Sequence, residues 1–162
     1  VRTVRLGKTY DAVISLFHVM SYQSSNTDLS AAFDTAASHL SPGGLFVFDF
    51  WYGPAVLTER PSVRVKRLEN SDIKVTRIAE PTIRYNENIV DVKYTVFVES
   101  KAKGDVEQLT ETHTMRYLFL PEILQLVSPK FELLSASAWM TDRTLTETDW
   151  SGCVCLVRTN RQ

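Results

Sequence analysis

Two apolar segments on either side of one amphipathic segment constrain the fold of this chain more than any other feature. Residues 12–17 (AVISLF) are apolar apart from Ser15, and such a run is typical of a strand buried on both faces. A second apolar run, LFVFDFW, covers residues 45–51. Two buried strands joined by a helix form a βαβ unit, which predicts a parallel pair with a right-handed crossover.

The segment between the two runs has the periodicity of an α-helix. Asn26 or Thr27 is expected to cap its first turn, and the Ser-Pro-Gly-Gly sequence at 41–44 is expected to end it. Its apolar residues recur every three or four positions and therefore share one face. These residues are Leu29, Ala32, Phe33, Ala36, Ala37 and Leu40.

Residues 62–119 alternate polar and apolar side chains, which predicts antiparallel strands with one solvated face. Turn residues occur at 70–71, 86–88 and 103–105. A group of basic residues near the start of this region suggests an anion patch, but interleaved acids favour a solvated strand face. The basic residues are Arg60, Arg64, Lys66, Arg67, Lys74 and Arg77.

The last part of the chain predicts one short helix and two more strands. PEILQLV begins at Pro121, a residue favoured in the first turn of a helix, and FELLSASAWM and GCVCLVRT have the composition of strands. The sequence thus predicts an α/β fold in three regions. They are a βαβ part of the core at 1–60, an antiparallel β insertion at 61–120, and a helix with the last two core strands at 121–162.

Charge and hydropathy exclude several classes of partner. The net charge of the 162-residue chain is −1, so the charge balance does not indicate nucleic acid or an anionic membrane. No apolar run approaches the roughly 20 residues that span a bilayer, and VRTVRLGKTYD lacks the apolar core of a signal peptide. We therefore expect a cytoplasmic location and no nucleic-acid or membrane partner.

The two cysteines do not form a metal or disulfide motif. Cys153 and Cys155 are two residues apart, so on a strand they lie on the same face and make a poor disulfide pair. No further cysteines are present to complete a zinc site. We interpret them as buried structural thiols and predict no metal.

Polar and aromatic residues follow the two predicted parallel strands at the point where each strand ends. The first strand ends at Phe17-His18 and the second at residues 49–52, Asp-Phe-Trp-Tyr. A core strand needs only apolar side chains, and open α/β sheets bind ligands beyond the carboxyl ends of their strands. The sequence therefore predicts a cleft at this edge of the sheet.

The motifs YDAVISLFHVMSYQSS and HLSPGGLFVFDFWYGP, an amphipathic helix between them and the antiparallel insertion together resemble the class I S-adenosylmethionine-dependent methyltransferases. The resemblance is to small-molecule N-methyltransferases of the glycine/sarcosine and amino-sugar type. It implies a partial Rossmann-like sheet made of the family's strands four to seven, with the seventh antiparallel. It also implies that 61–120 forms the substrate lid, which ETHTMRYLFLPEILQLV connects to the next helix. S-adenosylmethionine would be the methyl donor and a small molecule the acceptor.

The chain departs from that family in one respect. The family's glycine-rich cofactor loop and the acid that holds the ribose are not in this sequence. The resemblance then implies a carboxyl-terminal portion that alone is inactive and binds the donor weakly or not at all. Residues 12–17 would form an unprotected sheet edge, and we expect a second copy to cover it around a two-fold axis.

Two other functions stay open at this point. The first is a non-catalytic dimerisation or interaction module derived from the methyltransferase fold. The second is a nucleotide-binding oxidoreductase, which would share the βαβ unit but not the insertion at this place in the chain.

The resemblance places Phe17, His18, Val19 and Met20 beside the donor. His18 is a candidate general base, because imidazole titrates near neutrality, or else a hydrogen-bonded structural residue. Phe17 is either a cofactor wall or a core residue. His39 lies at a helix carboxyl terminus, where a cation is favoured, and we interpret it as structural.

Asp49, Trp51 and Tyr52 are predicted on the acceptor side, although Trp51 could instead anchor the lid. Asp49 is a candidate to hold an ammonium or hydroxyl group, and it needs a partner or an open cleft because a buried unpaired carboxylate is costly. His113 and Arg116 are candidate substrate residues on the last lid strand, where a spacing of three places them on opposite faces. Arg116 would bind a carboxylate or, the favoured alternative, form a surface salt bridge.

Overall fold

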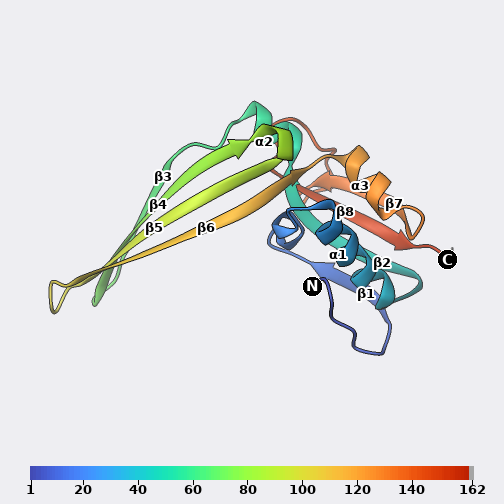
Figure 1. Ribbon diagram of the computed structural model, residues 1–162, viewed down its shortest axis with the longest axis horizontal. Helices are drawn as coiled ribbons and strands as arrows, with labels where there is room; N and C mark the ends of the chain where they lie inside the picture. The colour runs from blue at the N-terminus through green and yellow to red at the C-terminus, as the bar shows by residue number, and fades with distance from the viewer. Residues whose placement is uncertain (161–162) are drawn as a thin grey trace. The chain divides into compact units, whose positions relative to one another are not determined.

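The computed structural model describes residues 1–160 and divides into two compact units (Figure 1). Unit 1 contains residues 1–60 and the chain from Arg116 onward, and unit 2 contains residues 61–115. Strand β6 (Val106–Leu118) belongs to both, because its last three residues lie in unit 1. The units are described separately below.

The sheet of unit 1 contains the predicted parallel pair. Strand β1 (Tyr10–Ser15) pairs parallel with β2 (Leu40–Tyr52). On its other edge β2 pairs antiparallel with β8 (Ser151–Arg158), which pairs antiparallel with β7 (Phe131–Ala138). Strands β1, β2 and β7 therefore run in the same direction and β8 runs against them. This confirms the parallel βαβ unit and the antiparallel last strand.

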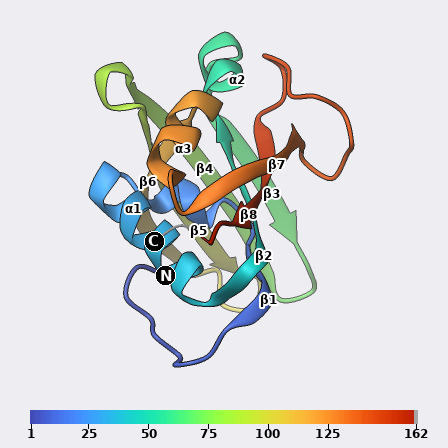
Figure 2. The same ribbon diagram turned by 90° about the vertical axis from the view of Figure 1, so that its right-hand side faces the viewer.

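Two helices pack on one face of this sheet (Figure 2). They are α1 (Asn26–Ser38) and α3 (Leu120–Val127), and their apolar residues share one buried cluster with the phenylalanines of β2. The rings of Phe33 and Phe48 lie 5.8 Å apart, and those of Phe46 and Phe48 lie 5.0 Å apart. Aromatic contacts at such distances add to the stabilisation from burial alone.

The start of α1 corrects one prediction. Ser25, and not Asn26 or Thr27, is the N-cap residue: its hydroxyl accepts a hydrogen bond from the backbone N–H of Asp28 at 3.1 Å. An N-cap residue has an extended backbone, as Ser25 does with φ −116° and ψ 160°, whereas Asn26 and Thr27 already lie inside the helix.

Three shorter helical elements lie elsewhere in the described part of the chain. Within residues 1–160 they are η1 (Val19–Tyr22), α2 (Gly53–Thr58) and η2 (Tyr85–Glu87). None of the helices in this described range is both long enough and apolar enough to cross a membrane.

The run at 12–17 is not buried on both faces, so that prediction is wrong. Strand β1 ends at Ser15, and the side chains of Ile14 and Phe17 are 67% and 82% exposed. The reason is the position of β1 in the sheet: among the strands of residues 1–160 it pairs with β2 alone. In the described part of the chain, no strand pairs with its second edge, as the sequence predicts for residues 12–17.

Unit 2 is an antiparallel β structure. Strand β3 (Arg64–Glu69) pairs with β4 (Ile73–Arg84), β4 pairs with β5 (Ile89–Ser100), and β6 follows β5 in the sheet. The connections fall at the predicted positions. Asn70 accepts two backbone hydrogen bonds in the first turn, and Asn88 and Gly104 have positive φ in the second and third.

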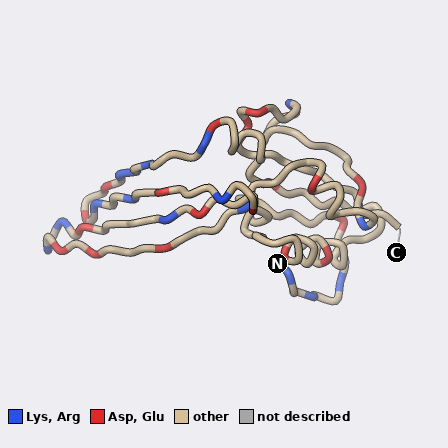
Figure 3. Tube along the Cα trace, turned by 45° about the horizontal axis from the view of Figure 1, so that its top comes forward, with Lys and Arg blue, Asp and Glu red and all other residues tan. Residues whose placement is uncertain are grey.

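Basic and acidic residues are interleaved along the strands of unit 2 (Figure 3). Lys74 lies 3.9 Å from the carboxylate of Glu99, and Lys101 lies 3.9 Å from that of Glu69. Strand β3 is exposed along its whole length. These observations agree with the solvated strand face favoured above and not with an anion patch.

Two phenylalanines with opposite exposure test this description of the core. Phe48 is fully buried and Phe17 is 82% exposed. Phe48→Leu should lower the free energy of unfolding by about 1–3 kcal/mol, because it removes packed atoms and leaves a cavity. Phe17→Leu should change it by less than about 0.5 kcal/mol. Urea denaturation followed by circular dichroism measures both, and equal effects would contradict the assigned core.

Candidate active site

The carboxyl ends of β1, β2 and β7 lie at the same edge of the sheet of unit 1, because these strands run in the same direction. The residues that follow are Phe17-His18 after β1, Trp51 and Tyr52 at the end of β2, and loop 139–150 after β7. This is the edge at which open α/β sheets bind ligands. The candidate site is therefore built from segments far apart in the sequence.

His18 and Asp49 are in direct contact at this edge. Both carboxylate oxygens of Asp49 accept the backbone N–H of His18, at 3.0 and 3.1 Å, and the Nδ1 atom of His18 lies 2.8 Å from Oδ2. Asp49 is only 1% exposed, whereas the His18 side chain is 34% exposed. The buried carboxylate thus has the partner that its burial requires.

An unusual backbone conformation directs the N–H of His18 at that carboxylate. Phe17 and His18 have φ values of 63° and 61°, in the left-handed region that residues other than glycine rarely adopt. Such conformations cost free energy and cluster at functional sites. The same turn leaves the Phe17 side chain largely exposed, so the prediction that Phe17 is a core residue is wrong.

Trp51 forms an aromatic wall beside His18. The Trp51 ring lies edge-on to His18, with centroids 6.3 Å apart, and edge-on to Trp150 at 5.7 Å. The backbone N–H of Tyr52 donates to the carbonyl oxygen of Trp150 at 3.0 Å. Trp150 was not predicted as a site residue, because it follows a polar loop with no motif. An indole directly before a strand was the only available signal.

The side chains of Trp51 and its neighbour Tyr52 point to opposite faces of β2. Successive side chains on a strand point to opposite faces, so Tyr52 packs against the core cluster and lies edge-on to Phe50 at 6.3 Å. The burial of Val19 and Met20 also differs. Val19 is half-buried, whereas Met20 is buried in the core.

Arg116 is not a surface residue, contrary to the favoured prediction. It is 6% exposed, forms an ion pair with Glu122 at the start of α3, and donates to the Asn26 side chain at 2.6 Å. Its guanidinium therefore links β6, α3 and α1. His113 lies in unit 2, where its Nε2 is 3.0 Å from a carboxylate oxygen of Glu111 and its ring is edge-on to Tyr94.

The cysteines lie on the same face of β8, as predicted, and both are half-buried. Burial raises the pKa of both thiols, and the Asp49 carboxylate raises that of Cys153 further. In the register of the sheet Cys153 lies opposite Asp49. Within residues 1–160, no three His, Cys, Asp or Glu side chains are grouped closely enough to hold a metal ion.

His39 is structural, as predicted, but not as a cation. Its Nε2 accepts the backbone N–H of Leu6 at 2.9 Å, and its Nδ1 lies 2.7 Å from the Thr35 carbonyl oxygen. A ring that accepts at one nitrogen and donates from the other is the neutral imidazole. It joins the N-terminal segment to α1.

Comparison with known proteins supports the sequence resemblance. No protein-family model matches the chain. The dTDP-3-amino-3,4,6-trideoxy-alpha-D-glucopyranose N,N-dimethyltransferase of Streptomyces venezuelae is 30% identical over 120 residues, which cover 72% of this chain and 50% of the relative. The chain therefore spans half the length of that curated relative.

Solved structures of methyltransferases share the fold. An S-adenosylmethionine-dependent methyltransferase from Clostridium acetobutylicum superposes with a TM-score of 0.81 at 14% sequence identity. The superposition covers 98% of this chain and 62% of the Clostridium protein. The sugar N-methyltransferase KedS8 from Streptoalloteichus gives 0.79 at 17% identity, with coverage of 98% and 60%. DesVI from Streptomyces venezuelae gives 0.76 at 20% identity, with coverage of 98% and 62%.

The fold is that of the class I S-adenosylmethionine-dependent methyltransferases, and β1, β2, β7 and β8 correspond to the predicted strands four to seven. By fold the chain is similar to methyltransferases of that class, and in sequence it is similar to the Streptomyces venezuelae N,N-dimethyltransferase described above.

Asp49→Asn tests the contact between His18 and Asp49. The carboxylate beside Nδ1 favours the tautomer with its proton on Nδ1, so the substitution should give a mixture of tautomers. Two-bond proton–nitrogen NMR spectra of the His18 ring measure this. The control is Asp11→Asn, which removes an exposed carboxylate of β1 and should leave the His18 signals unchanged. An unchanged tautomer in Asp49→Asn would contradict the assigned contact.

Proposed function

We propose that the protein encoded by the complete gene transfers a methyl group from S-adenosylmethionine to the amino group of a nucleotide-linked amino sugar. The observation that carries this proposal is the His18–Asp49 pair at the ligand-binding edge of a methyltransferase fold. The choice of acceptor is supported by the curated relative, whose name specifies a dTDP-linked amino sugar and N,N-dimethylation.

The residues after β1 fit one wall of a donor site. Phe17 presents an aromatic ring to solvent directly beyond the strand end, and half-buried Val19 follows it. Aromatic faces attract cations, so Phe17 would hold the positively charged donor, and Val19 would add an apolar contact. S-adenosylmethionine, when bound, supplies an electrophilic methyl group on a positively charged sulfur.

His18 is proposed as the general base. Its Nδ1 faces Asp49, which leaves Nε2 as the ring nitrogen with a lone pair. A protonated amine must lose a proton before its nitrogen can attack the methyl group, and the ammonium product formed by the attack loses another proton afterwards. A histidine within hydrogen-bond reach can accept such a proton. Nε2 is therefore the proposed proton acceptor.

Asp49 acts through His18 in this proposal. Both of its oxygens accept the backbone N–H of His18, and Oδ2 lies 2.8 Å from Nδ1, so in this proposal it positions His18 and does not hold the acceptor directly. This differs from the role expected from the sequence. Trp51, whose ring lies beside His18, is proposed to form the acceptor side.

His18→Gln tests the base. It should lower kcat by about 10²–10⁴-fold, the usual contribution of a positioned base, with methyl transfer to a nucleotide-linked amino sugar assayed in the complete gene product. Asp49→Asn should reduce kcat by a smaller factor, because the ring remains. Asp11→Asn is the control and should retain wild-type activity. A His18→Gln enzyme with a kcat close to the wild-type value would contradict the assignment.

We also propose that residues 12–17 pair with the same segment of a second copy. The proposal is supported by the unprotected edge of β1 and by the exposed Ile14 side chain. In antiparallel two-fold pairing centred on Val13, Asp11 would face Ser15, so no like charges would oppose each other. The alternative of a non-catalytic dimerisation module uses the same surface.

Sedimentation analysis tests the dimer. Wild-type chain should sediment as a dimer, and Ile14→Lys should shift it to monomer because a charge on an edge strand opposes pairing. Leu109→Lys, at another exposed strand position in unit 2, is the matched control and should leave the dimer intact. A monomeric wild-type chain would exclude the dimer. A dimer whose complete gene product transfers no methyl group would favour the non-catalytic module.

A further inference from the structure

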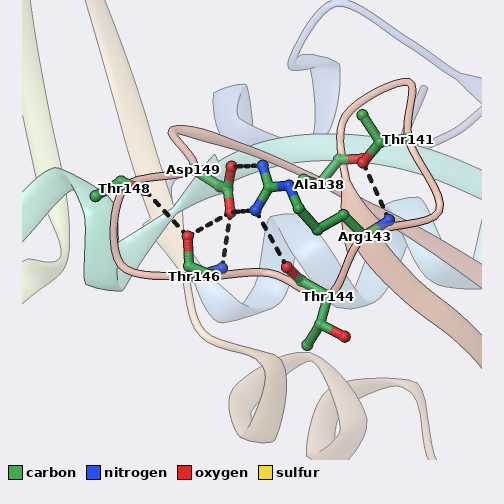
Figure 4. Close-up of polar contacts among 7 residues, drawn as sticks. All are labelled: Ala138, Thr141, Arg143, Thr144, Thr146, Thr148 and Asp149. Carbon is green, nitrogen blue, oxygen red and sulfur yellow. Dashed lines mark hydrogen bonds and ion pairs between the residues drawn. The ribbon is translucent and has the colours of Figure 1, made fainter.

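Loop 139–150, between β7 and β8, contains an ion pair that the proposed mechanism does not use (Figure 4). The guanidinium of Arg143 donates to both carboxylate oxygens of Asp149, at 2.8 and 2.5 Å. The backbone N–H and the hydroxyl of Thr146 donate to the same carboxylate at 2.8 and 2.7 Å. We call this group of three residues the Arg143–Asp149 clasp.

The clasp fixes the carboxylate from several directions. Hydrogen bonds from Arg143 and Thr146 hold the pKa of Asp149 well below its usual range, so the carboxylate stays charged at neutral pH. The Asp149 side chain is 11% exposed, although that of Arg143 is 55% exposed. A two-pronged guanidinium contact has a narrow geometry, which a single surface ion pair lacks.

The clasp is also tied to the end of β7. The backbone N–H of Ala138, the last residue of that strand, donates to the Arg143 carbonyl oxygen at 2.9 Å. The Thr141 hydroxyl donates to the Ala138 carbonyl oxygen at 2.9 Å. The backbone N–H of Asp149 donates to the Thr146 carbonyl oxygen at 3.1 Å. The position of residue 149 is therefore determined at both its side chain and its backbone.

The next residue in the chain is Trp150, which contacts the candidate site. Its ring lies 5.7 Å from that of Trp51, and the Trp51 ring lies 6.3 Å from that of His18. A continuous set of contacts thus runs from the clasp to the proposed base. Within it, Trp150 is the residue that the loop supplies, and its ring lies edge-on to that of Trp51.

We propose that the Arg143–Asp149 clasp is a positioning device for the acceptor side of the site: it fixes Trp150 against Trp51 and so sets the indole wall beside His18. A pyranose ring, whose C–H groups pack on indole faces, is the class of acceptor that such a wall recognises. The statement about acceptor binding rests on the proposed function, whereas the statement about Trp150 does not.

The contact between the two indoles can be measured without an activity assay. Close indoles in a fixed orientation give an exciton couplet in far-ultraviolet circular dichroism, and the chain should show one that Trp150→Phe abolishes. Asp149→Asn and Arg143→Gln should each lose most of the couplet while the chain stays folded. Asp34→Asn, which removes the exposed Lys130–Asp34 ion pair elsewhere in unit 1, is the matched control and should keep it.

A full couplet in both clasp variants would overturn the proposal. If Asp149→Asn does not fold, Arg143→Gln alone decides, because Arg143 is exposed and its truncation leaves the core unaltered. Arg143→Lys keeps the charge without the two-pronged geometry and should give an intermediate couplet.

Kinetics on the complete gene product separate positioning from a general effect on stability. Arg143→Gln should raise the KM for a nucleotide-linked amino sugar roughly tenfold, with the binding of S-adenosylhomocysteine unchanged in calorimetric titration. A variant that loses the couplet but keeps the wild-type KM would overturn the positioning role and leave the proposed function intact. If no methyl transfer is found, the proposed function fails, and the couplet alone still decides whether the clasp sets Trp150.

Discussion

Side chains alternate between the two faces of β2, and the rest of unit 1 depends on this alternation. Phe46, Phe48 and Phe50 point to the face covered by α1 and α3, while Asp49 and Trp51 point to the other. The same strand therefore anchors the core and carries the site. A register shift of one residue would exchange the two sets, which the aromatic packing makes costly.

A charged group buried beside that core needs a specific partner. Asp49 finds one in the backbone and ring of His18, and the left-handed turn at Phe17 and His18 makes this possible. The strain of the turn is offset by hydrogen bonds to a charged acceptor, which are stronger than those between neutral groups. The interaction explains both why the turn persists and why the carboxylate is tolerated there.

Local patterns were enough to predict the parallel strands, helices α1 and α3 and the antiparallel insertion, because these depend on periodicity that each segment carries by itself. Contacts between distant segments could not be predicted in this way. The burial of Arg116 depends on Asn26 and Glu122, and the role of Trp150 depends on Trp51. The exposure of Ile14 also depends on which strands surround β1, and no pattern within residues 12–17 records that.

The two left-handed residues after β1 limit what can replace them during evolution. Glycine at either position would relieve the backbone and keep the chain path, but at position 18 it would also delete the ring beside Asp49. β-Branched residues are disfavoured at both positions by their bulk near the main chain. A lineage that drifted to glycine at 18 would therefore keep the turn and lose the proposed proton acceptor, so this single codon is where a catalytic and a purely structural descendant would diverge.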